Sequence, residues 1–105
     1  ARVAELAWGF QDSVTDVLVT KTIRAARATG ARSIVLGGGV AANSVLRDRL
    51  LGAATDLGVP VVIPRPGLCT DNGAMIGAAA TRRLAAGERA GLDLDARPSL
   101  PLAAR

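Results

Sequence analysis

Two short apolar runs, separated by one helical pattern, limit this chain to an α/β arrangement. The runs are Ser33–Leu36 and Val59–Ile63; each contains β-branched residues and lies next to a glycine. Between them, from about Asn43 to Leu57, apolar residues recur at three- and four-residue steps, as on one face of a helix. Two strands joined through a helix predict a parallel βαβ unit with a right-handed crossover.

Two further helices are predicted outside this unit. The first begins near Val3 and ends at Gly30, because apolar residues at helical spacing stop at a residue that is typical of C-caps. The other begins at Thr70 or Asp71, either of which can cap it, and ends at Gly87. Two strands form a poor sheet, so we interpret the helix, strand, helix, strand, helix order as part of a larger domain.

The chain divides into a patterned part and a tail. Residues 1–89 are predicted to form the α/β segment, and residues 90–105 an extended tail that contains Pro98 and Pro101 and has no periodicity. The sequence opens inside a helical pattern and without methionine. We interpret this opening as that of a segment from a longer protein.

Composition excludes several kinds of site. Cys69 is the only cysteine and there is no histidine, which excludes a disulfide framework, a cysteine zinc cluster and a self-contained histidine-based site. The net charge is +4, with basic residues dispersed, which is typical of solvated helix faces and permits a polyanionic partner without requiring one. No apolar run has the roughly 18 residues of a membrane span, and no signal peptide is visible. We therefore predict a cytoplasmic protein without a membrane partner.

A run of three glycines, Gly37–Gly39, directly follows the first predicted strand and leads into a helix. The missing Cβ atoms let a ligand approach the main chain, and the free amide groups of the next helix point to the same place. Asn43 can cap that helix or form hydrogen bonds with a ribose or phosphate. A tight turn after a strand produces the same pattern, so the residues alone leave both interpretations open.

Asp71 follows the second predicted strand, at the edge where parallel sheets place their ligands. A carboxylate there can bind a divalent metal. It can equally be the N-cap of the next helix, a role that contributes about 1 kcal/mol. Cys69 has no second cysteine to pair with, and this favours a small buried residue over a nucleophile.

Several segments together resemble the bacterial tRNA threonylcarbamoyl-adenosine synthase family, earlier described as O-sialoglycoprotein endopeptidases. In the order of the family's motifs, they are Phe10–Gln11, Gly38–Asn43, Leu46–Arg47, Cys69–Ile76, Arg97–Pro98 and Pro101–Leu102. The resemblance covers essentially the whole chain. The octapeptide from Cys69 is its most specific part, whereas many actin-like ATPase-fold proteins share the glycine turn.

The resemblance implies a fold and a site. The fold is the C-terminal α-β-α-β-α portion of the second actin-like ATPase, or ribonuclease-H-like, domain, with an incomplete sheet. Gly38 and Gly39 would line an adenosine pocket, Asn43 would contact the adenylate-bearing substrate, and Asp71 would be one ligand of a divalent catalytic metal, iron or zinc. The family's other metal ligands are two histidines from an upstream helix, and its phosphate-contacting loop and a further substrate-binding aspartate also lie upstream. We therefore expect this chain alone to be catalytically incomplete.

The implied reaction is acyl transfer from threonylcarbamoyl-AMP to the exocyclic amine of the tRNA adenosine 3′ of the anticodon. The implied partners are tRNA, threonylcarbamoyl-AMP, a paralogous actin-like protein and a P-loop ATPase. No catalytic residue or general base is identified. Two alternatives remain. One is a hydrogenase-maturation or antibiotic-tailoring carbamoyltransferase of the same fold, against which the Cys69–Met75 segment argues. The other is a non-catalytic actin-like partner or scaffold, in which Asp71 only caps a helix.

Overall fold

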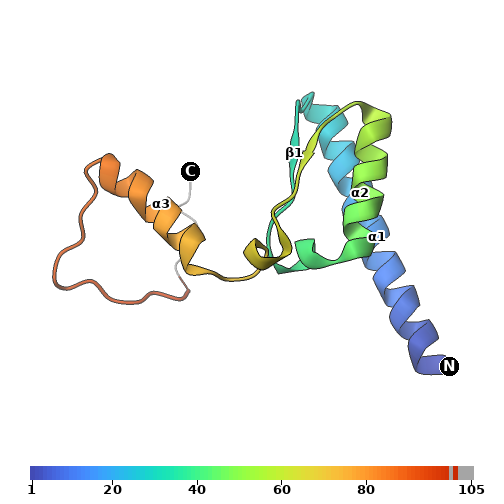
Figure 1. Ribbon diagram of the computed structural model, residues 1–105, viewed down its shortest axis with the longest axis horizontal. Coiled ribbons are helices and arrows are strands. Elements are labelled where there is room, and N and C mark those ends of the chain that lie inside the picture. Colours follow the sequence, from blue (N-terminus) through green and yellow to red (C-terminus); the bar gives the residue numbers. More distant parts are fainter. Residues whose placement is uncertain (100, 102–105) are drawn as a thin grey trace. The chain divides into compact units, whose positions relative to one another are not determined.

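The structure, a computed structural model that describes residues 1–99 and 101, alternates helices with two short strands (Figure 1). The elements in chain order are helix α1 (Arg2–Thr29), strand β1 (Ile34–Val35), 3-10 helix η1 (Gly39–Ala42), helix α2 (Ser44–Leu57), strand β2 (Val61–Val62), 3-10 helix η2 (Pro66–Leu68) and helix α3 (Gly73–Ala85). The chain forms two compact units, of which the first is Ala1–Asn72 and the second begins at Gly73.

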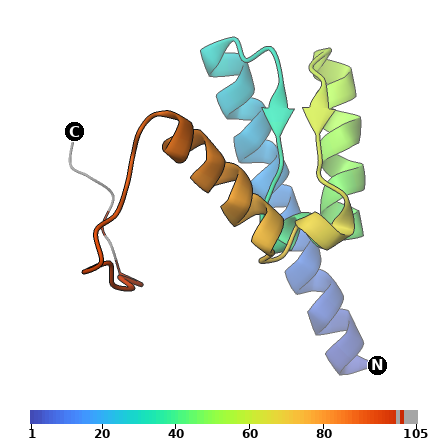
Figure 2. The same ribbon diagram turned by 60° about the vertical axis from the view of Figure 1, so that its left-hand side comes forward.

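The two strands pair in parallel, as predicted, with Ile34 opposite Val61. Figure 2 shows α1 and α2 on the same side of this pair. Each strand has only two residues and is shorter than its apolar run. Val59 lies outside the ladder because its N–H donates to Ala54 O at 2.9 Å, which completes the end of α2 instead.

Glycines end both helices of this unit, as predicted. Gly30 and Gly58 have φ values of 63° and 72°, in the left-handed region that glycine adopts without a Cβ penalty. The amide of the residue after Gly30, Ala31, donates to Ala26 O at 3.0 Å, so carbonyl groups at the end of α1 are satisfied. These caps turn the chain back sharply and start each strand beside the helix that precedes it.

The core lies where the second half of α1, β1 and α2 meet. Its buried residues are Ile23, Ala26, Ile34, Leu50 and Ala54. The apolar face predicted from Val3 is a single continuous helix, but the N-terminal end of that helix extends beyond α2 (Figure 1). Val3, Leu6 and Phe10 are accordingly exposed.

The second unit contains α3, whose start differs from the prediction. The helix begins at Gly73, so the position directly before it is Asn72, and the predicted capping by Thr70 or Asp71 is wrong. Asparagine is as favourable as aspartate at an N-cap, which is why residue preference did not locate the boundary. The predicted end at Gly87 agrees with its left-handed φ of 86° and with a hydrogen bond from its N–H to Leu84 O at 3.0 Å.

The predicted tail contains no helix or strand within residues 90–99 and 101, while residues 100 and 102–105 of that prediction lie outside the described part. Among the described residues, no helix combines the length and the hydrophobicity that a membrane crossing requires.

Candidate functional site

The glycine turn between β1 and α2 is open to solvent. Gly38 has φ 91° and ψ 173°, a conformation that is essentially restricted to glycine. A Cβ atom at Gly37, Gly38 or Gly39 would meet no other atom within 4 Å. Backbone geometry, and not crowding within this chain, therefore requires glycine at position 38. The main chain of the turn is free for a ligand to approach.

The chain enters α2 through η1, a 3-10 turn that the sequence analysis did not predict. Ala41 N–H donates to Gly38 O at 3.0 Å, and Ala41 is completely buried. This turn separates the glycines from the first residue of α2 and brings Asn43 to the N-cap position.

Asn43 is a helix cap and also forms a long-range contact. Its Oδ1 accepts a hydrogen bond from Leu46 N–H at 3.0 Å, so the capping interpretation of this residue is confirmed. Its Nδ2 donates to Oε1 of Gln11, on α1, at 3.0 Å. Phe10–Gln11 is one of the motifs that carry the family resemblance, but no role was predicted for it. Only the packing of α1 against α2 shows that Gln11 reaches the glycine turn.

A hollow of about 340 Å³ lies beside this amide pair. Its lining residues are Phe10, Gln11, Val14, Thr15, Val40 and Asn43. Two motifs that are about thirty residues apart in the sequence thus meet around one cavity. The walls are mainly apolar, and the polar groups come from Gln11, Thr15 and Asn43.

Arg47 connects the glycine turn to the loop that precedes Asp71. Its Nε donates to Ala41 O in η1, and its Nη2 donates to Pro64 O at 2.8 Å and to Cys69 Sγ at 3.2 Å. Cys69 is only 3% exposed, which agrees with the prediction of a small buried residue. One planar guanidinium group therefore joins two segments that the resemblance assigns to substrate and metal binding.

Arg47→Met is expected to lower the free energy of unfolding by about 2–4 kcal/mol, because the carbonyl groups of Ala41 and Pro64 lose a charged donor. Denaturant unfolding of the protein in its full length measures this. Arg65→Met is the matched control, since Arg65 is exposed, and it is expected to change stability by no more than about 0.5 kcal/mol. Equal stability of the two variants would contradict the connecting role of Arg47.

Asp71 lies in the exposed loop between η2 and α3. Within the described residues the carboxylate of Asp71 takes part in no hydrogen bond or ion pair. Asp71 lies two residues before Gly73, the first residue of α3. The side chain is therefore not committed to a structural role in this chain. A carboxylate in this state is free to bind a cation.

The described residues do not form a complete metal site. No group of three or more histidine, cysteine, aspartate and glutamate side chains in residues 1–99 and 101 is arranged to hold a metal ion. Cys69 is buried and in contact with Arg47, whereas the carboxylate of Asp71 is exposed. Protein metal centres usually take about three or four protein ligands, so the described residues provide at most a part of one.

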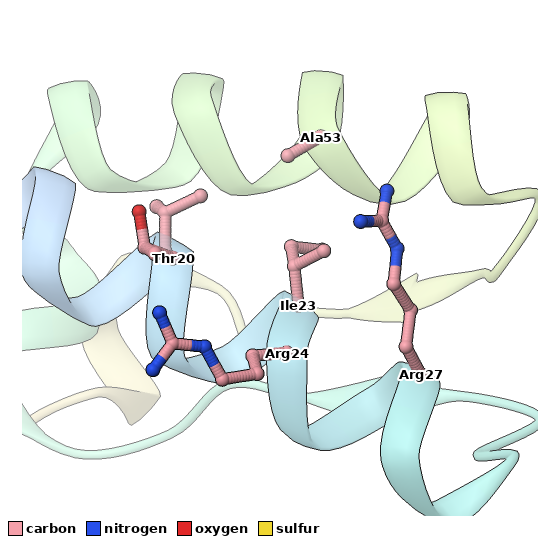
Figure 3. A pocket seen from close by; sticks show the side chains of 6 residues that line it. Thr20, Ile23, Arg24, Arg27 and Ala53 are labelled. Atoms are coloured by element: carbon pink, nitrogen blue, oxygen red, sulfur yellow. The ribbon is translucent and has the colours of Figure 1, made fainter.

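A second hollow, of about 410 Å³, lies about three helical turns further along α1 (Figure 3). It is lined by Val19, Thr20, Ile23, Arg24, Arg27 and Ala53. Figure 3 shows the side chains of Arg24 and Arg27 on either side of Ile23. None of the residues that the sequence analysis selected for the site lies in this hollow.

Comparison with known proteins places these residues in a family. Residues 1–78 match the family model described as tRNA N6-adenosine threonylcarbamoyltransferase. The chain belongs to this family. The match includes Gly38, Gly39, Asn43 and Asp71, and it confirms the resemblance on which their assignment rests. Their individual roles stay predictions.

Relatives named tRNA N6-adenosine threonylcarbamoyltransferase are similar over nearly the whole chain. The protein from Moorella thermoacetica is 54% identical over 99 residues, and that from Sorangium cellulosum is 50% identical over 103 residues; these matches cover 94% and 96% of this chain. The Thermomicrobium roseum protein is 52% identical over 103 residues, or 98% of this chain. The chain spans 29%, 29% and 27% of the lengths of these three threonylcarbamoyltransferases.

Membership of the threonylcarbamoyltransferase family implies an actin-like, ribonuclease-H-like fold. The three helices and two parallel strands of the described residues are consistent with an α/β portion of that fold. The family match also removes the reason for considering a carbamoyltransferase of the same fold.

Proposed function

We propose that this chain forms part of an enzyme that transfers the threonylcarbamoyl group from threonylcarbamoyl-AMP to the exocyclic amine of the tRNA adenosine 3′ of the anticodon. The observation that carries the proposal is the family match over residues 1–78, which contain the open glycine turn, Asn43 and Asp71. An enzyme that has the length of the relatives and contains this chain is called the full-length enzyme below.

The glycine turn and Asn43 are proposed to bind the nucleotide part of the acyl donor. The open main chain at Gly38 and Gly39 lets an adenosine approach closely, and the amide groups at the start of η1 and α2 favour an anionic or hydrogen-bond-accepting group. Asn43 adds a side-chain donor at the same place. Arg47 keeps this turn and the Pro64–Cys69 loop in a fixed relation.

In the transfer, a bond forms between the exocyclic nitrogen of the tRNA adenosine and the carbonyl carbon of the threonylcarbamoyl group. The bond from that carbon to the phosphate oxygen breaks, AMP leaves with the oxygen, and the amine loses a proton. The contribution of this chain is to hold and orient the donor, a role that brings the reacting atoms together. No residue of the chain is assigned the proton transfer.

Asp71 is proposed to supply one ligand of a divalent metal, iron or zinc, in the full-length enzyme. Its free carboxylate supports this, and the remaining ligands would come from outside the described residues. Because these residues do not form a metal site by themselves, no step of the reaction is assigned to the metal here.

The family name includes tRNA, and the net charge of +4 is favourable for such a polyanion. We further propose that the full-length enzyme works in the cytoplasm with a paralogous actin-like protein and a P-loop ATPase. A scaffold without activity is the competing hypothesis, and it predicts that Asp71 is dispensable.

The 105-residue chain alone is expected not to modify tRNA, because it spans under a third of the relatives' length. The assay supplies threonylcarbamoyl-AMP and unmodified tRNA and measures threonylcarbamoyl-adenosine by mass spectrometry after nuclease digestion. The full-length enzyme, with its partner proteins, is expected to produce it. Modification by the short chain at a comparable rate would show that the rest of the enzyme is unnecessary, and absence of product with the full-length enzyme would refute the proposed function.

A further inference from the structure

The hydrogen bonds of Asn43 determine the orientation of two carboxamide groups. Oδ1 of Asn43 accepts from the backbone N–H of Leu46, so Nδ2 must be the atom that faces Gln11. Gln11 must then present its oxygen, Oε1, to Asn43. Its own Nε2 group consequently points away from Asn43. A backbone donor that cannot change its polarity thus orients both side chains in turn.

The third polar side chain of the hollow cannot take part in ligand binding. Thr15 is 2% exposed, and its single hydroxyl proton is shared between the main-chain oxygens of Gln11 and Asp12, which lie 2.9 and 3.0 Å from Oγ1. The same oxygen accepts from Arg49 Nη1 at 3.0 Å. The N–H donors left available to a ligand are one from Asn43 and two from Gln11, beside the apolar walls formed by Phe10, Val14 and Val40.

We propose that Gln11 is a positioning residue for Asn43, and that the free amide N–H groups of the oriented pair face the substrate. The group that Asn43 meets is then an acceptor, such as a hydroxyl, phosphate or ring-nitrogen atom. This inference rests on the proposed function for the identity of the substrate. The orientation of the pair depends only on the two hydrogen bonds of Asn43.

The first test measures transfer kinetics of the full-length enzyme with two single variants and with the double variant that combines them. Gln11→Met keeps the length of the side chain but removes the acceptor for Asn43. Asn43→Ser keeps an N-cap oxygen for Leu46 N–H but removes the amide donor. We expect Gln11→Met to raise KM for threonylcarbamoyl-AMP about fivefold to tenfold, and Asn43→Ser to raise it about tenfold or more. In both variants kcat is expected to stay within about twofold of the value for the unsubstituted enzyme.

The double variant, Gln11→Met with Asn43→Ser, decides whether Gln11 acts through Asn43. Its KM is expected to equal that of Asn43→Ser alone within about twofold, because Gln11 has nothing left to position. Multiplied effects of the two substitutions would overturn the proposal, as would an unchanged KM in Gln11→Met. If Gln11→Met only destabilised the fold, it would lower the active fraction of the enzyme, and hence kcat, both alone and in combination with Asn43→Ser.

A further variant tests the amide donor of Asn43. Asn43→Asp keeps the cap but replaces the amide donor with acceptors, so KM is expected to rise further than in Asn43→Ser. A KM for Asn43→Asp equal to that of the unmodified enzyme would show that the substrate offers a donor at this point, which contradicts the proposal.

A second readout does not depend on the reaction. The side-chain amide resonances of Asn43, identified by their loss in Asn43→Ser, are expected to shift in Gln11→Met and to stay near their positions in Gln11→Glu, whose carboxylate still accepts from Nδ2. Unchanged resonances in Gln11→Met would overturn the positioning role. If the unmodified enzyme transfers no threonylcarbamoyl group, the proposed function fails, whereas these resonances still decide the role of Gln11.

Discussion

Replacing Asp71 with asparagine in the full-length enzyme is expected to remove most of the bound metal and most of the transfer activity. The amide oxygen is neutral and lacks the charge attraction that holds a divalent cation. The free energy of unfolding is expected to stay within about 0.5 kcal/mol, because Asp71 is exposed and makes no hydrogen bond or ion pair among the described residues. Elemental analysis, tRNA modification and thermal unfolding measure the three quantities.

Two controls separate metal binding from other effects at this position. Asp71→Ala is expected to behave as Asp71→Asn does, including its unchanged stability, since α3 begins at Gly73 and the side chain does not occupy the capping position. Asp56→Asn makes the same chemical change at an exposed residue of α2 and is expected to leave metal content and activity unchanged. Full metal occupancy with normal tRNA modification in Asp71→Asn would show that Asp71 is not a ligand of the metal.

Alanine at the two glycines of the turn is expected to have two different consequences. Gly38→Ala should lower the free energy of unfolding by about 1–3 kcal/mol, because φ 91° with ψ 173° is strained for any residue with a Cβ atom. Gly39→Ala should change stability by less than about 0.5 kcal/mol, since its φ is ordinary and the added methyl group meets nothing within 4 Å. Unfolding of the full-length enzyme measures both values.

The same pair of variants tests the adenosine pocket. If the nucleotide lies against Gly39, the methyl group of Gly39→Ala occupies part of the nucleotide's place. The affinity for a non-hydrolysable analogue of threonylcarbamoyl-AMP, measured by calorimetry, is then expected to fall by about tenfold or more. Gly52→Ala, on the exposed face of α2, is the control and should leave this affinity unchanged. Unaltered affinity in Gly39→Ala would remove this glycine from the proposed pocket.

Local features of the sequence were sufficient for the order of elements and for several of their ends. Gly30 and Gly58 both adopt the left-handed conformation that ends α1 and α2, and the two apolar runs pair in parallel. These features depend on backbone preferences and periodicity within a few residues, which a single sequence displays directly. The motif around Cys69 identified the family in the same way, without knowledge of any contact.

Residue preference was insufficient where neighbouring residues have similar preferences. Thr70, Asp71 and Asn72 are all good N-caps, and only the structure places the start of α3 at Gly73. The apolar run from Val59 predicted a longer strand, but its first amide completes the end of α2. In both cases competing hydrogen bonds, and not composition, determine the boundary.

The sequence by itself determined the α/β order, the glycine turn and the family to which this chain belongs. Tertiary structure alone decided which side chains meet there: Gln11 reaches Asn43 across 32 positions, and Arg47 reaches Cys69 across 22. Such contacts depend on how α1 lies against α2 and on the path of the loop after β2. No local pattern encodes these distances, because each results from the packing of many residues at once.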